Sequence, residues 1–195
     1  MPERNKEHGM TLVEILVGLV MMGIIVTGIY NLFRVHNLMA AKQEETTMMQ
    51  QELLTALVDM SEELRMCGFK PMGIGNFGFN ATATNQTSIY CTRGMSLNNN
   101  STNIIAYTRN STNHLLVYMT DDDTWVEAAS NISDLRFAYY DANSVEISNP
   151  TSGNVDKIRM VEINATATPS PARAALGISN RNMHTRVWLR NMGLD

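Results

Sequence analysis

Glu14 is the residue of this chain whose surroundings most clearly suggest a chemical role. It is the only charged residue in the predominantly apolar run of 24 residues from Met10 to Phe33. A carboxylate on a helix inside a bilayer costs several kcal/mol unless it is paired, so such an acid is by default a functional candidate. The alternative is that Glu14 lies shallow enough for its carboxylate to reach the lipid head groups.

Two cysteines, Cys67 and Cys91, form a second candidate site. They do not form a Cys-x-x-Cys pair, and the four histidines are scattered along the chain: His8, His36, His114 and His184. Without clustered ligands a zinc site is not predicted. Two cysteines pair readily in an exported domain and stay reduced in a cytosolic one, so their state depends on the compartment.

A group of carboxylates around residue 120 could in principle bind calcium, because Ca²⁺ prefers oxygen ligands. The group consists of Asp121, Asp122, Asp123 and Glu127. It lacks the Asp-x-Asp-x-Asp-Gly order of a calcium loop, so a solvated turn is the expected structure and no metal is predicted.

The sequence offers little support for catalysis or for nucleic-acid binding. It has no Gly-x-Ser-x-Gly, no phosphate-binding loop and no His-Glu-x-x-His motif. An anchored periplasmic enzyme would have to use His114 or His184 with nearby acids, and we predict neither an enzyme nor a cofactor. The net charge of −4 and the absence of a Lys/Arg cluster argue against nucleic-acid binding.

The apolar run that holds Glu14 is long enough to cross a membrane. As a helix, its 24 residues would extend about 36 Å, against a hydrocarbon core of about 30 Å. A secretory signal has a shorter apolar core followed by a small-x-small cleavage site, and neither is found here. The sequence therefore predicts a membrane helix over residues 10–33, preceded by a polar segment over residues 1–9.

The helix is predicted to continue as an amphipathic segment over residues 34–67. Apolar side chains recur every three or four residues: Val35, Leu38, Met39, Met49, Leu53, Leu57, Met60 and Leu64. The other side is polar and includes Glu44, Glu45, Glu52, Glu62 and Glu63. Gly68 and Pro71 are expected to end the helix. The apolar stripe could form a coiled-coil dimer, but its heptads are imperfect, and we expect it to pack on the following domain.

Residues 68–195 are predicted to form a β-rich head. Strands are expected at these runs: Ser88–Cys91, Asn103–Arg109, His114–Thr120, Thr124–Ala128, Leu135–Tyr140 and Val155–Ile163. The second and third runs make a plausible hairpin, and Arg181–Arg190 is either a strand or a short helix. A long helix followed by antiparallel strands predicts an α+β fold.

The segment from Gly9 to Glu14 reads Gly-Met-Thr-Leu-Val-Glu and resembles the prepilin peptidase recognition motif of type IV pilins and type II secretion pseudopilins. The resemblance implies a leader over residues 1–9, cleavage between Gly9 and Met10, and methylation of the new amino group of Met10. Glu14 would then pair with the free amine of a neighbouring subunit inside the filament, where a buried pair sets register. The implied partners are prepilin peptidase, other pilins and the inner-membrane assembly machinery.

Weaker resemblances follow in order along the chain. Residues 64–69, Leu-Arg-Met-Cys-Gly-Phe, and the VWLRNM segment near the C-terminus resemble PilW-type minor pilins and the J pseudopilin of type II secretion. The family plan, a helical spine on a sheet, implies a pilin-like fold and a minor pilin that primes or caps pilus assembly. A pseudopilin of a type II secretion system is the alternative. Many major pilins carry a proline in the membrane helix, whereas here no proline occurs between Pro2 and Pro71.

This resemblance also implies a topology. The leader would lie in the cytoplasm, the helix would cross the inner membrane once, and the head would lie in the periplasm before entering a pilus. Cys67 and Cys91 would both be exported, so we predict a disulfide that fixes the end of the helix to the first loop of the head.

Overall fold

The computed structural model describes residues 10–71, 77–94, 102–110, 115–118 and 124–193. The chain divides into two compact units, Met1–Glu44 and Glu45–Asp195. The predicted leader, residues 1–9, lies outside the described residues. The elements, in order, are α1 (Leu12–Arg65), β1 (Ser88–Gly94), β2 (Thr102–Arg109), β3 (Leu115–Tyr118), β4 (Trp125–Ala129), β5 (Ile132–Tyr140), η1 (Val155–Lys157), β6 (Met160–Ala167), η2 (Pro171–Leu176) and β7 (Arg181–Trp188).

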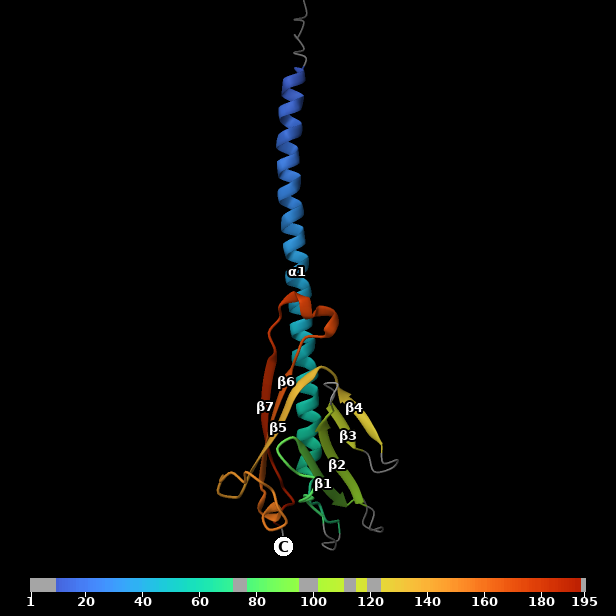
Figure 1. Ribbon diagram of the computed structural model, residues 1–195, viewed down its shortest axis with the longest axis vertical. Coiled ribbons are helices and arrows are strands. Elements are labelled where there is room, and N and C mark those ends of the chain that lie inside the picture. Colours follow the sequence, from blue (N-terminus) through green and yellow to red (C-terminus); the bar gives the residue numbers. More distant parts are fainter. Residues whose placement is uncertain (1–9, 72–76, 95–101, 111–114, 119–123, 194–195) are drawn as a thin grey trace, which may run out of the picture. The chain divides into compact units, whose positions relative to one another are not determined.

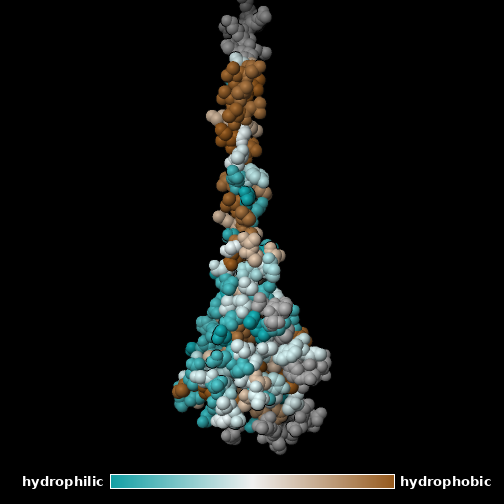
Figure 2. All heavy atoms as spheres, viewed as in Figure 1, coloured by the Kyte–Doolittle hydropathy of each residue, from teal (hydrophilic) through white to brown (hydrophobic). Residues whose placement is uncertain are grey.

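The described part of the first unit is the N-terminal part of α1. Its apolar side chains are exposed, and Figure 2 shows a hydrophobic surface over the upper part of the helix, interrupted by hydrophilic patches further down. The helix is long and apolar enough to cross a membrane, with a mean hydropathy of 2.5 in its most apolar window. Because a helix satisfies its own backbone hydrogen bonds, it is the form that such a sequence takes in lipid.

The second unit contains the C-terminal part of α1 and two antiparallel sheets (Figure 1). The first sheet has the order β1-β2-β3-β4 and the second β5-β6-β7, so each is a simple meander. The predicted hairpin is confirmed by the antiparallel pairing of β2 with β3. The predicted α+β, pilin-like fold is therefore confirmed, and the C-terminal run is a strand rather than a helix.

The head has one hydrophobic core to which the helix and both sheets contribute. The helix adds its apolar stripe, Met49, Leu53, Ala56, Leu57, Met60 and Leu64, and the strands add alternate residues such as Ile105, Phe137 and Ile163. The stripe thus packs on the head from Met49 onward, as its imperfect heptads indicate, whereas Val35, Leu38 and Met39, which we predicted in the same stripe, are exposed. The loop before β1 is tied to the second sheet, because the amide of Phe137 in β5 donates to the Gln86 carbonyl at 2.8 Å.

One predicted strand is wrong in its first half. The run Val155–Ile163 alternates only loosely, and its first residues form the short helix η1, with strand β6 beginning at Met160. The reason lies in the loop before it. Asn154 accepts a hydrogen bond from the Thr151 amide and donates one to the Asn149 carbonyl. This local network favours a turn over an extended strand.

The end of α1 is fixed by the residue predicted to end it. Gly68 has φ +75°, in the left-handed region, and a Cβ atom added to it would lie 2.6 Å from the sulfur of Met192. Glycine is the residue that tolerates both conditions. The Gly68 amide donates to the Thr92 carbonyl of β1 at 3.1 Å, so the end of the helix is tied to the first sheet.

Candidate processing and assembly segment

The structure describes the predicted cleavage region from Met10 onward, and Thr11 of this region caps the N-terminus of α1. Met10 and Thr11 are not helical, and the helix begins at Leu12. The Thr11 hydroxyl accepts a hydrogen bond from the Glu14 amide at 3.3 Å. Thr11 is therefore the N-cap, and Met10 lies just outside the helix, where its backbone is not enclosed by helical hydrogen bonds. Gly9 lies outside the described residues.

Glu14 occupies the third position of the helix after Thr11. Thr11-Leu-Val-Glu14 matches the Ser/Thr-x-x-Glu pattern of a capping box, and we did not predict this cap although its spacing is visible in the sequence. A carboxylate in the first turn is also stabilised by the partial positive charge at the N-terminus of a helix. The fold therefore holds Glu14 at the same end of α1 as Met10, which is 72% exposed.

The helix surface that follows Glu14 has no packing role within its own unit. Leu19 is 69% exposed and Ile24 is 64% exposed. A Cβ atom added to Gly18, Gly23 or Gly28 would meet no heavy atom within 4 Å. Glycine in a helix interior is destabilising by about 1 kcal/mol relative to alanine, and no contact within the described chain offsets that cost.

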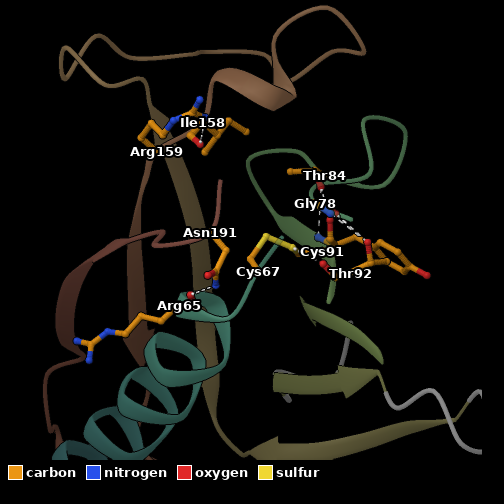
Figure 3. Close-up of a disulfide and its surroundings, with 10 residues drawn as sticks. Arg65, Cys67, Gly78, Thr84, Cys91, Thr92, Ile158, Arg159 and Asn191 are labelled. Carbon is orange, nitrogen blue, oxygen red and sulfur yellow. Dashed lines mark hydrogen bonds between the residues drawn. A yellow bond between two sulfur atoms is a disulfide. The ribbon is translucent and has the colours of Figure 1, made fainter. Parts of the chain in front are cut away.

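A disulfide joins Cys67, just after α1, to Cys91 in β1, with the two Cα atoms 5.8 Å apart (Figure 3). Both cysteines are fully buried. At the same junction, the Asn191 side chain donates to the Arg65 carbonyl at 3.2 Å, which satisfies a carbonyl of the last helical turn. The end of α1, strand β1 and the segment after β7 thus meet at this junction.

A buried glutamate marks the place where the head begins. Glu45 is 5% exposed and accepts a hydrogen bond from the Ser170 amide at 2.7 Å. Its other oxygen lies 3.5 Å from Nε of Arg173 in η2. The Ser170 hydrogen bond, helped by the Arg173 charge, holds the pKa of Glu45 below its ordinary value although burial acts in the opposite direction. We predicted Glu45 on the polar side of the helix, and that prediction is wrong.

The other residues considered for chemistry are the carboxylates near residue 120 and two histidines of the head. Asp121, Asp122, Asp123 and His114 lie outside the described residues, and His184 is exposed on β7. Among the residues that the structure describes, no group of three or more His, Cys, Asp or Glu side chains could hold a metal ion.

Comparison with known protein families gives one result, and it falls on the segment just described. A family model, described as the prokaryotic N-terminal methylation motif, matches residues 4–30. The chain carries a prokaryotic N-terminal methylation motif. The matched residues include the Gly9–Met10 junction, the Thr11 cap and Glu14.

The methylation motif, the apolar helix that contains it and the α+β head together make this chain type IV pilin-like. The motif indicates processing by prepilin peptidase and assembly with other pilins, and the apolar helix indicates membrane anchoring. No curated protein and no solved structure matches the chain.

Proposed function

We propose that this chain is a minor type IV pilin, a structural subunit that is processed by prepilin peptidase and helps to prime or cap pilus assembly. The observation that carries the proposal is the placement of the methylation motif, residues 4–30, at the start of a helix whose apolar surface the described chain leaves exposed. Such a surface requires lipid before assembly and neighbouring subunits after it.

In this proposal the precursor is inserted with residues 1–9 in the cytoplasm and the head in the periplasm. The peptidase cleaves the Gly9–Met10 bond and methylates the new amino group of Met10. Since Met10 and Thr11 precede the helix, the bond to be cut adjoins non-helical backbone that a protease can approach. The inner-membrane assembly machinery then moves the helix from lipid into the filament.

Glu14 supplies the register of assembly in this scheme. Transfer from lipid to a filament core changes the buried apolar area little, so a specific polar contact must set the alignment of the helices. The methylated amine of Met10 in one subunit and the Glu14 carboxylate of its neighbour neutralise each other, and a buried pair of this kind fixes register more than it adds stability. The capped first turn keeps the carboxylate at the end of the helix.

Replacement of Gly9 tests the processing step. We expect Gly9→Val to keep residues 1–9 attached and to abolish incorporation into filaments, because a β-branched side chain blocks close approach to the backbone. Gly18→Ala is the matched control, since Gly18 lies within the motif in open space and its variant should be processed normally. Intact-mass spectrometry of the membrane-bound protein gives the readout. A Gly9→Val chain of normal mature mass in normal filaments would refute the proposal.

A deletion strain separates the pilus from secretion. Loss of surface pili with secretion intact supports the minor pilin. Loss of secretion with pili intact supports the second candidate, a pseudopilin of a type II secretion system. Residues 64–69 of this chain also resemble the J pseudopilin of that system.

A further inference from the structure

A polar cavity of about 280 Å³ lies in the head where three segments from distant parts of the sequence meet. Its polar lining comes from the segment after α1 (Lys70), from the region of η1 (Asp156 and Arg159) and from the segment after β7 (Asn191 and Gly193). Pockets for small ligands usually measure roughly 300–1,000 Å³. The cavity is therefore close to the size that holds one small molecule.

Arg159 is held in place at this cavity by its neighbours. Its amide donates to the Tyr140 carbonyl of β5 at 2.8 Å, and its carbonyl accepts from the Leu189 amide at 2.9 Å. In the side chain, Nη1 donates to the backbone carbonyls of Asp156 and Ile158, the second of these at 3.0 Å (Figure 3). These contacts fix one side of the guanidinium group before any ligand binds, so little side-chain entropy is left to lose.

The other side of the same guanidinium group is open. Nε and Nη2 of Arg159 form no hydrogen bond with the residues that the structure describes. Gly193 leaves room for them, because it has φ +80° and a Cβ atom added to it would lie 2.7 Å from Nε and closer still to Nη2. Nε and Nη2 form one edge of the planar group, and such an edge binds the two oxygens of a carboxylate side by side.

A second cation faces the same cavity. Lys70 lines it together with Arg159, and no ion pair joins either side chain to a residue that the structure describes. These two positive charges outnumber the one carboxylate of the lining, that of Asp156. Like charges around one cavity repel each other, and an anion between them removes the repulsion. The cavity thus favours an anion with a single negative charge, because Asp156 opposes a second.

The remaining polar groups of the lining are hydrogen-bond acceptors. The amide nitrogen of Asn191 is occupied, since it donates to the Arg65 carbonyl at 3.2 Å, and this leaves Oδ1 of Asn191 to accept. The carboxylate of Asp156 also accepts, and no residue that the structure describes donates to it. A ligand that satisfies the whole lining therefore needs a donor in addition to its carboxylate, and a hydroxyl group supplies one.

We propose that this cavity binds a small hydroxycarboxylate, with the carboxylate on Arg159 and Lys70 and the hydroxyl group on Asp156 or Asn191. The site is independent of the proposed role in filament assembly, because all of its residues belong to the second unit. A bound ligand joins the segment after α1 to the region of η1 and to the segment after β7. Since the unfolded chain lacks this arrangement, the ligand should also stabilise the head.

Three matched small molecules test the ligand class on the wild-type chain. The full chain in detergent micelles is titrated at constant ionic strength with glycolate, which carries a carboxylate and a hydroxyl group. We expect a dissociation constant of about 1–10 mM, as suits a ligand of only about five non-hydrogen atoms. At about ten times that concentration the unfolding temperature of the head should rise by about 2–4 °C. Acetate, without the hydroxyl group, should bind at least about fivefold more weakly, and ethylene glycol, without the carboxylate, should cause no rise.

Two variants and a matched control locate the site. Arg159→Lys keeps the charge but loses the paired donors, and Lys70→Gln removes the second cation. Each should weaken the binding of glycolate at least about fivefold. Lys157→Gln is the control, because Lys157 is exposed beside Asp156 and does not line the cavity, and its variant should bind as the wild type does. Circular dichroism of each variant shows whether the head is folded.

The position of the ligand is read from NMR of the chain labelled with ¹⁵N at arginine. The Nε–H signal that is missing in Arg159→Lys should shift on addition of glycolate and reach saturation. An unfolding temperature of the wild type that glycolate does not change would overturn the proposal, and this measurement needs no variant. Equal binding of glycolate and acetate would overturn the hydroxycarboxylate as the ligand. Equal losses in Lys70→Gln and Lys157→Gln would also overturn the site, since overall charge would then explain the binding.

Discussion

Residues 12–44 and residues 45–65 belong to one uninterrupted helix, but their apolar side chains have different surroundings. In residues 12–33 of the first part apolar residues occur on every side and are exposed, with Leu19 at 69%. In the second part they form a stripe, so that Leu53 is fully buried while its neighbour Leu54 is 53% exposed. A stripe can be covered by one domain, whereas a helix that is apolar all round needs lipid or several neighbouring helices. The head therefore covers the second part, and the first part depends on its environment.

The largest expected effect comes from the buried stripe. Leu53→Ala should destabilise the head by about 3–5 kcal/mol, through lost apolar contact and the cavity that remains. Leu54→Ala is the matched control and should change stability by less than about 0.5 kcal/mol. Thermal unfolding of the full chain in detergent micelles, followed by tryptophan fluorescence, measures both. Equal effects of the two variants would mean that the stripe does not pack on the head.

The disulfide should have the next largest effect. In the chain-entropy model, a loop closed across the 24-residue separation of Cys67 and Cys91 stabilises by about 3 kcal/mol. The double variant Cys67→Ser/Cys91→Ser should lower the free energy of unfolding by about that amount, and the unfolding temperature should fall with it. Thiol-blocking mass spectrometry without reductant supplies an independent check and should find no free thiol in the wild type. Two blocked thiols in natively purified protein would contradict the bond.

The sequence predicts the features that depend on local pattern. The all-round apolar run, the stripe, the glycine that ends α1 and most strands follow from periodicity and turn residues. It does not predict the division of the strands into two sheets. That division falls at Asn131, which has φ +57° between β4 and β5, and an asparagine indicates a turn without indicating whether the strands on its two sides pair with each other.

Glu45 shows why part of the site could not be predicted either. A glutamate among polar neighbours indicates a solvated helix face, because a lone buried carboxylate is costly. The partners that make burial tolerable, the Ser170 amide and Arg173, are more than a hundred residues away in the sequence, at the short helix η2, which periodicity does not predict. By contrast, Thr11 could have been identified as the helix cap from its spacing to Glu14.

Glu45→Gln should have an intermediate effect, because it weakens the contact that joins the start of the head to η2. We expect a loss of about 1–3 kcal/mol at pH 7, the usual cost when a buried charged hydrogen bond is lost. Glu62→Gln is the control, since Glu62 is exposed on the same helix.

The effect of Glu45→Gln should also depend on pH. The pKa of Glu45 is lowered in the folded head, mainly by the Ser170 hydrogen bond. Its contribution is therefore complete above the unfolded pKa of about 4.3 and is lost as the pH falls through the folded value. The difference in unfolding temperature between wild type and Glu45→Gln should shrink as the pH falls below about 4. A difference that stays constant between pH 7 and pH 3 would exclude the charged contact as its cause.

The smallest effect on the subunit is expected in the first part of the helix, at Gly23. A Cβ atom at this position meets nothing, and the Thr27 hydroxyl donates to the Gly23 carbonyl, a contact that alanine keeps. Gly23→Ala should strengthen the helix locally by about 1 kcal/mol and leave the unfolding temperature of the head unchanged. If glycine is retained for close approach of a neighbouring helix, the same variant should nevertheless incorporate less well into filaments. A Gly23→Ala subunit that is as stable as the wild type but assembles less well would assign residues 12–44 to contacts between chains. Full incorporation of Gly23→Ala would leave Gly23 without a role in those contacts.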